Sequence, residues 1–173
     1  MALIKNWDNN TWLSSKDYIR SFSKFLIQNT KLNFKSEILD IGCGRGKISG
    51  NLYSELKLTS KPIGIDIANH KDKDKRVKFK KSNGLTFLNK NKNFFDLILI
   101  KQTIHLLKMN EITKLINLCK KSLKSKGVIV VLTLDPNKNE IPTFKLMNTK
   151  LENSLNRDKK IITLLKKNNK VLK

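Results

Sequence analysis

Two aspartates and three alternating glycines stand near the ends of apolar segments early in the chain. The glycines are Gly42, Gly44 and Gly46, and Asp40 stands two residues before the first of them. Glycines permit unusual backbone angles and remove side chains that would block a ligand. Asp66 ends the next apolar segment, where a carboxylate can accept hydrogen bonds from two ribose hydroxyls. These residues predict a site that holds a sugar and a positive charge.

The glycine spacing separates this turn from one that binds a pyrophosphate. The chain has G-x-G-x-G, whereas dinucleotide-binding turns have G-x-G-x-x-G. The carboxylate of Asp40 has little reason to approach a phosphate, but it suits a ligand with an ammonium and a sulfonium. A nicotinamide-linked oxidoreductase is therefore the weaker interpretation. Asp66 also has a simpler role open to it, because it could cap a following helix.

Strands that alternate with helices must position these residues. Apolar runs predict four strands, at 36–41, 62–67, 94–100 and 128–132, and the alternation of apolar and basic residues predicts another at 77–80. We expect helices at 15–29, from the capping-box residues Ser14 and Ser15, after Gly46, and after Asn110 as the cap. Lys126 and Gly127 are expected to turn into the fifth strand. This alternation predicts an α/β fold with a doubly wound, mostly parallel sheet of about five strands and flanking helices.

The 173 residues are expected to form one domain. We expect a helical cap over 1–34, a core over 35–135 and a helical segment over 136–173, with helices at 141–156 and 158–168. No apolar run approaches the roughly 18 residues that span a bilayer, and the N-terminus lacks a secretory signal. These features predict a cytoplasmic protein without a membrane partner. Cys43 and Cys119 have no metal-ligand spacing and are interpreted as free reduced thiols.

The order of these features resembles the class I methyltransferases that use S-adenosylmethionine (SAM), over about residues 36–134. The segment 38–47 matches their first motif, 64–67 their second, and 95–106 their fourth. The resemblance implies a Rossmann-like fold and SAM as the cofactor. Asn83 falls where the family often has an Asp or Asn against the adenine, and it departs from the commoner acid. The cofactor-binding residues implied are Asp40, Gly42, Cys43, Gly44, Gly46, Asp66, Ile67, Asn83, Gly84, Lys101 and Gln102.

His105 is the one candidate for a general base near the fourth strand, and packing at the start of a helix is the alternative role. The other histidine, His70, lies in a charged turn that alternates Lys and Asp. Trp7 and Trp12 could close the pocket or pack onto the sheet. The residue types give no metal site.

The net charge of +22 comes from 32 Lys and only 4 Arg, beside 20 Asn. A basic surface attracts nucleic acid, but Lys and Asn both have A/T-rich codons, so genome bias explains this composition too. We expect a small-molecule methyl acceptor. The alternatives are an RNA or protein acceptor, or a truncated protein that binds SAM without catalysis.

The last two strands of the family fold are missing from the sequence pattern. An uncovered sheet edge favours association. Either the expected C-terminal helices or a second copy of the chain could cover it, and the second case would form a homodimer.

Overall fold

The computed structural model describes residues 15–101, 103–132 and 163. Its five strands form one sheet in the order β3-β2-β1-β4-β5, and every neighbouring pair is parallel. The strands are β1 (Ile38–Ile41), β2 (Ile63–Asp66), β3 (Lys78–Lys81), β4 (Phe95–Lys101) and β5 (Leu123–Leu132). The helices are α2 (Lys16–Asn29), α3 (Lys47–Glu55), α4 (Gly84–Leu88) and α5 (Met109–Ser122), with a short 3-10 helix η2 (Ile104–Leu106). The predicted doubly wound parallel sheet is confirmed.

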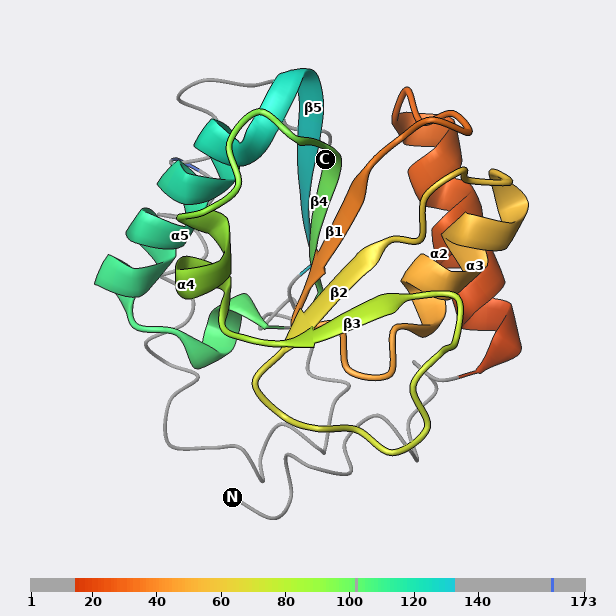
Figure 1. Cartoon of the computed structure of the whole chain (residues 1–173), viewed down its shortest axis with the longest axis horizontal. Helices are drawn as coiled ribbons and strands as arrows, with labels where there is room; N and C mark the ends of the chain where they lie inside the picture. Colours follow the sequence, from red (N-terminus) through yellow and green to blue (C-terminus); the bar gives the residue numbers. More distant parts are fainter. Residues whose placement is uncertain (1–14, 102, 133–162, 164–173) are drawn as a thin grey trace.

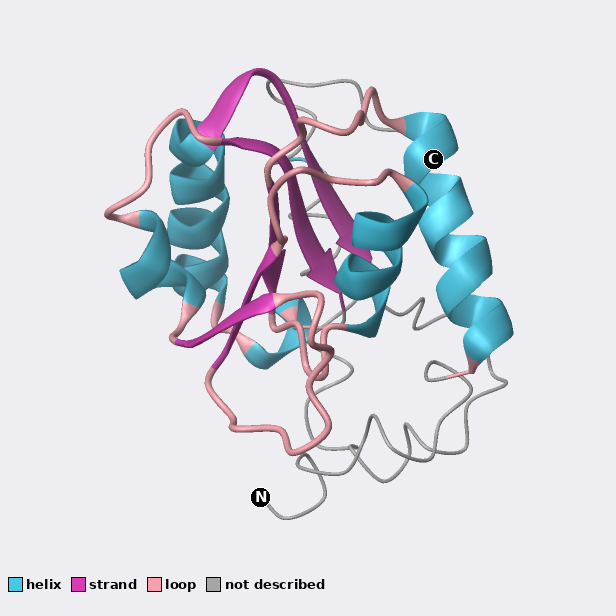
Figure 2. Cartoon of the chain, turned by 45° about the vertical axis from the view of Figure 1, so that its right-hand side comes forward, coloured by secondary structure: helices cyan, strands magenta, loops and turns pink. Residues whose placement is uncertain are grey.

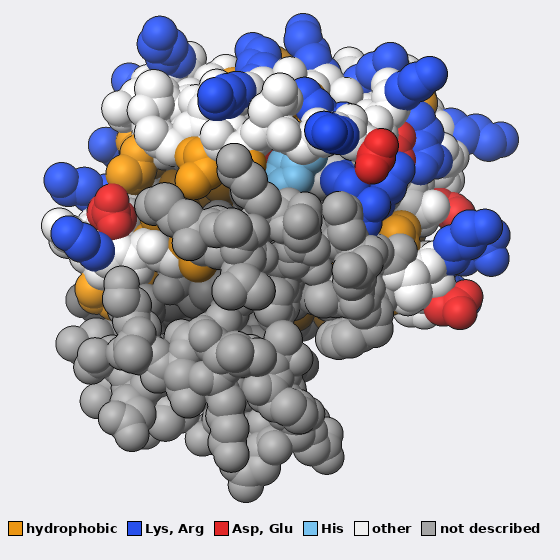
Figure 3. Space-filling model, turned by 90° about the horizontal axis from the view of Figure 1, so that it is seen from below, with side chains coloured by type: hydrophobic (Ala, Val, Ile, Leu, Met, Phe, Trp, Pro, Cys, Tyr) orange, Lys and Arg blue, Asp and Glu red, His pale blue; other side chains and the backbone are white. Residues whose placement is uncertain are grey.

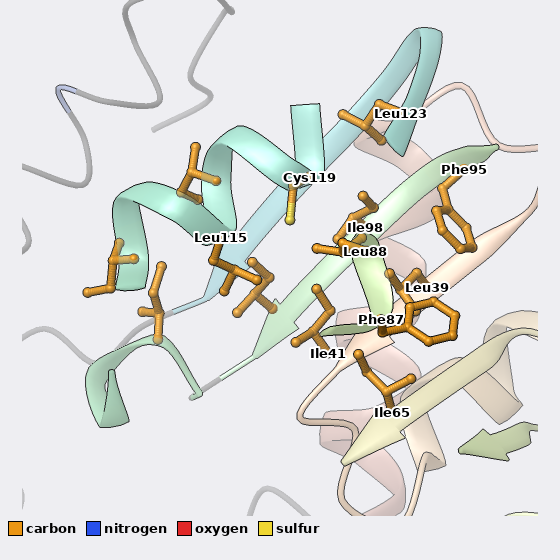
Figure 4. Packing of buried hydrophobic residues seen from close by; sticks show 14 residues of the cluster. Leu39, Ile41, Ile65, Phe87, Leu88, Phe95, Ile98, Leu115, Cys119 and Leu123 are labelled. Atoms are coloured by element: carbon orange, nitrogen blue, oxygen red, sulfur yellow. The ribbon is translucent and has the colours of Figure 1, made fainter. Parts of the chain in front are cut away.

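Both faces of the sheet are covered, because alternate residues of each strand point to opposite sides. In Figure 1, α2 and α3 lie on one side of the sheet and α4 and α5 on the other. On β1, Ile38 packs with the apolar cluster under α2 and α3. Leu39 and Ile41 pack with the cluster under α4 and α5, which Figure 4 shows from close by. This two-sided burial explains why the central strands β1 and β4 are almost continuously apolar in sequence.

The chain leaves β1 toward one edge of the sheet through β2 and β3, and then crosses to β4 on the other side of β1. The strand order therefore reverses between β1 and β4. Because the strands are parallel, their carboxyl ends meet at one edge, and the loops that follow them gather there (Figure 2). Open α/β sheets bind ligands in the crevice outside this reversal point.

Several element boundaries differ from the sequence-based expectation. Helix α5 begins at Met109 with Lys108 as its cap, not Asn110, because the Glu111 carboxylate accepts a hydrogen bond from the Lys108 backbone N–H at 2.8 Å. Strand β5 begins at Leu123 directly after α5, without a separate turn at 126–127. Its pairing with β4 shifts between Phe95 and Leu97, so the regular ladder starts at Val128.

Some expectations concern residues that lie outside the described part of the chain. These are the helix at 141–156, the helix at 158–168 apart from residue 163, the residue Gln102, and the two tryptophans Trp7 and Trp12. Among the described residues, no helix is long and apolar enough to cross a membrane.

Candidate functional site

The glycine turn after β1 is fixed to the neighbouring strand by its backbone. All three glycines have positive φ, at 68°, 54° and 70° for Gly42, Gly44 and Gly46. The backbone N–H groups of Gly42 and Cys43 donate to the Ile65 carbonyl at 2.8 and 3.1 Å. A side chain at position 42 is also excluded by space, because its Cβ would lie 1.9 Å from Thr103 Oγ1. The turn is therefore a preformed backbone surface between the ends of β1, β2 and β4.

Asp66 at the end of β2 faces this glycine turn. Its Oδ2 accepts a hydrogen bond from the Gly44 N–H at 2.9 Å, and its Oδ1 accepts one from the Ala68 N–H at 2.8 Å. The side chain is 13% exposed. No helix follows it, so the helix-capping role considered from the sequence is wrong. The carboxylate instead connects the tips of two adjacent strands.

Ile67 directly follows Asp66 in the chain, and Asn83 lies beyond the end of the neighbouring strand β3. Ile67 is 70% exposed, which leaves a large apolar side chain at the surface directly after the acid. Asn83 is the N-cap of α4, and its Oδ1 accepts from the Thr86 N–H at 2.8 Å. Gly84 follows in the first turn, where its added Cβ would lie 2.8 Å from a Leu115 methyl. The α4 cap was not expected from the sequence.

Asp40 and Cys43 are both buried beneath the turn. Asp40 is 3% exposed, and its carboxylate accepts a short hydrogen bond from the Ser49 hydroxyl of α3. Cys43 packs against β2, where an added Cβ on Gly64 would lie 2.8 Å from its Sγ. Both residues support the turn from below, and direct contact of Asp40 with a ligand stays a prediction.

An ion pair that the sequence analysis missed fixes the loop between β2 and β3. The Arg76 guanidinium donates two hydrogen bonds to the Asp74 carboxylate, at 2.9 and 2.8 Å, and a third to the Ser54 hydroxyl of α3. Lys47 at the start of α3 lies 4.0 Å from the same carboxylate. The hydrogen bonds from Arg76 hold the pKa of Asp74 below its ordinary value. The Asp74 N–H also donates to the Arg45 carbonyl, so the loop is joined to the glycine turn.

The end of β4 lies on the other side of β1 from Asp66. The Lys101 ammonium lies 5.9 Å from the centroid of the Tyr18 ring on α2. The Thr103 hydroxyl donates to the Lys101 carbonyl at 3.0 Å. His105 lies in η2, just beyond β4, and its side chain is outside the described part of the structure, as is residue 102. Figure 3 views this end of the sheet, with hydrophobic side chains to one side of a histidine and basic side chains to the other.

The structure brings most of the predicted residues to one edge of the sheet. Gly42, Gly44, Asp66 and Lys101 stand at the ends of three adjacent strands, in the order β2-β1-β4. Asn83 lies two residues beyond the end of β3. Among the described residues, no group of three or more His, Cys, Asp or Glu side chains is arranged to hold a metal ion.

Comparison with protein families gives one match across most of the chain. The model of a methyltransferase domain matches residues 32–172. The chain belongs to this methyltransferase-domain family. No curated protein matches the sequence of this methyltransferase-family chain.

Solved structures of methyltransferases share the fold. One is a 1,6-didemethyltoxoflavin-N1-methyltransferase from Burkholderia thailandensis, with its substrate and S-adenosylhomocysteine (SAH) bound. It is 16% identical with a TM-score of 0.60, over 75% of this chain and 58% of the other. A SAM-dependent methyltransferase from Archaeoglobus fulgidus is 22% identical with a TM-score of 0.57, over 75% and 56% of the two chains.

A phosphoethanolamine N-methyltransferase from Haemonchus contortus, crystallised with phosphoethanolamine and SAH, is 14% identical with a TM-score of 0.60. The match covers 75% of this chain and 30% of that one. The methyltransferase-family chain therefore spans less than two thirds of the length of these neighbours. At such identities the likeness establishes the fold.

Proposed function

We propose that this chain is a SAM-dependent methyltransferase that acts on a small-molecule acceptor. The observation that carries the proposal is the Asp66 carboxylate at the tip of β2, 2.9 Å from the Gly44 N–H and directly before the exposed Ile67. A carboxylate can accept hydrogen bonds from two ribose hydroxyls, and an adjacent apolar side chain suits one face of an adenine. Membership of the methyltransferase family and the SAH-bound neighbours support the same ligand.

The residues fit each part of such a cofactor. Asp66 would hold the ribose, Ile67 and Asn83 would lie along the adenine, and the backbone of Gly42, Gly44 and Gly46 would lie beneath the amino-acid tail. Asp40, under the turn, would add a negative field that favours a cationic ligand, with Cys43 and Gly84 packing behind the site. Lys101, Gln102 and His105 would lie toward the acceptor.

The cofactor supplies a methyl group activated by a positive sulfur. The protein contributes mainly by positioning, which in favourable cases provides about 7–11 kcal/mol of rate acceleration. Residues at the end of β4 would orient the acceptor toward that methyl. A general base is needed only where the acceptor nucleophile carries a proton that must leave, and His105 is the candidate for that role.

Calorimetric titration with SAH tests the proposal. The wild-type chain should bind, and Asp66→Ala should weaken binding by about 1.5–3 kcal/mol, because charge-assisted hydrogen bonds to the ribose are lost. Asp72→Ala, which removes an exposed carboxylate from the same loop, is the control and should bind like wild type. Failure of the wild-type chain to bind SAH at millimolar concentration would end the proposal.

The net charge of +22 favours a second candidate, an RNA acceptor. Exposed Lys78, Lys80 and Lys81 on the edge strand β3 provide part of this charge, although lysines also protect a sheet edge from pairing. An RNA substrate requires binding whose affinity falls steeply with salt. Methyl transfer from labelled SAM to RNA, with such a slope, would favour this candidate over a small molecule.

A further inference from the structure

We infer that His70 is a cofactor-positioning residue that shares the ribose hydroxyls with Asp66, so that cofactor affinity falls when its imidazole gains a proton. This inference rests on the proposed function. To the proposed cofactor site the inference adds His70, which the sequence pattern assigned to a charged turn. The structure folds that turn back on the tip of β2.

The geometry places the imidazole beside the carboxylate. His70 Nε2 lies 3.6 Å from Asp66 Oδ2, and the two side chains are only 16% and 13% exposed. A carboxylate has about four lone-pair sites. Two of them accept the Gly44 and Ala68 N–H groups. A ribose diol would use the remaining lone-pair sites, and these belong to the same carboxylate that His70 faces.

The charge state of His70 determines whether the imidazole or a ribose hydroxyl donates a hydrogen bond to those lone pairs. The 3.6 Å between His70 Nε2 and Asp66 Oδ2 is too long for a hydrogen bond, so the lone pairs on this side of the carboxylate are open to a ribose hydroxyl. A neutral imidazole also has one acceptor nitrogen, which can receive the second ribose hydroxyl. A protonated imidazole has two donors and no acceptor, and its attraction to Asp66 brings one N–H to donate a hydrogen bond to the carboxylate oxygen. Protonation therefore removes one acceptor and occupies another.

The other charged groups of the loop have partners of their own or are exposed to solvent. Among the described residues, Asp66 is the one carboxylate within ion-pair distance of His70. On the same loop, Asp74 is held by Arg76, and the Lys73 ammonium donates to Asn69 and lies over the Phe79 ring. Lys71 and Asp72 are exposed. Carboxylates titrate near pH 4 and lysines near pH 10, whereas imidazole changes charge between pH 5 and 8.

The test is calorimetric titration of the full chain with SAH between pH 5.5 and 8. For the wild type we expect affinity to rise about tenfold over this range, the size of effect that one linked proton produces. His70→Gln, which keeps a neutral hydrogen-bonding side chain, should show a nearly flat profile. Lys71→Gln is the matched control, because it removes an exposed charge from the neighbouring position and should keep the wild-type slope.

A flat wild-type profile, or a slope that persists in His70→Gln, would overturn the inference while leaving the proposed function intact. Absence of SAH binding at every pH would instead overturn the proposed function. A second measurement needs no variant. In the wild-type chain, SAH should move the NMR titration midpoint of the His70 imidazole to lower pH, and an unchanged midpoint would also refute the inference.

Discussion

The two halves of the sheet are stabilised by different interactions. Strands β2 and β3 have four residues each, and their loops are fixed by polar contacts, from Gly44 to Asp66 and from Arg76 to Asp74. Strand β4 has seven residues, of which five are fully buried apolar side chains. The first half is held at its tips by charged groups, and the second by packing along its length.

This difference explains why the cofactor is easier to infer than the acceptor. Charged residues at strand tips have chemical preferences, so Asp66 points to a hydroxyl-bearing ligand. Apolar residues such as Leu99 and Ile100 state only that a strand is buried. In the proposed function the acceptor would lie beyond the end of β4, and many residues that follow β4 and β5 lie outside the described part of the chain.

The largest expected effect is a loss of stability in the packed half. Ile98 is fully buried in the cluster under α4 and α5 (Figure 4). Ile98→Ala should lower the free energy of unfolding by about 2–5 kcal/mol, because it removes buried methyl groups and leaves a cavity. Urea denaturation measures this change. A loss below about 1 kcal/mol would mean that side-chain packing is not the main source of stability for β4.

The next effect tests the polar half. Asp74→Asn should lower stability at neutral pH by about 1.5–3 kcal/mol, since it leaves the Arg76 hydrogen bonds without their charged acceptor. Asp72→Asn, an exposed neighbour, is the control and should stay within about 0.5 kcal/mol of wild type.

The pH dependence of this effect has a defined sign. Arg76 lowers the pKa of Asp74 in the folded protein, so the stabilisation is fully present above the unfolded value of about 4. It is lost as the pH falls through the folded pKa. The stability difference between wild type and Asp74→Asn should thus be constant from about pH 5 upward and shrink below about pH 4. A difference that stays constant to pH 2 would show that Asp74 acts without its charge.

Much of the fold could be predicted because apolar runs mark each buried strand. The glycine turn and Asp66 could also be predicted from the sequence, since their residue types and spacing indicate a ligand site without knowledge of the tertiary structure. Helix α4 was missed because its five residues are too few to show a helical period. The start of β5 was misplaced because its pairing with β4 continues, with a shift, across Gly127.

The contacts of the loop between β2 and β3 could not be predicted from sequence. In a run of alternating Lys and Asp, each side chain looks solvated. Asp74 is buried only because the loop folds back against α3, where its backbone meets Arg45 and its carboxylate faces Gly50. The approach of His70 to Asp66 depends on the same folding of the loop. Such pairings follow from three-dimensional packing and leave no periodic signal.

A smaller effect should appear in binding alone. Ile67 is 70% exposed, so Ile67→Ala should change stability by less than about 0.5 kcal/mol. If an adenine covers this side chain, the variant should lose about 1 kcal/mol of SAH affinity, roughly fivefold, from the apolar contact removed. Calorimetry and thermal denaturation separate the two quantities. Unchanged affinity would show that Ile67 lies away from the ligand.

The smallest effect concerns the cap of α4. Asn83→Ala removes the side-chain oxygen that accepts the Thr86 N–H, and it should cost about 0.5–1 kcal/mol of stability. Asn83→Asp keeps the cap and adds a charge that is favourable at a helix N-terminus, so its stability should match that of wild type. The two variants also test whether Asn83 contacts the ligand. If Asn83 contacts the adenine, the SAH affinity of Asn83→Ala should be lower than that of wild type under conditions where both proteins are folded. Asn83→Asp, which keeps a hydrogen-bonding oxygen at this position, should bind SAH at least as tightly as wild type. Equal SAH affinity in all three proteins would restrict Asn83 to its capping role and place the adenine contact on Ile67 alone.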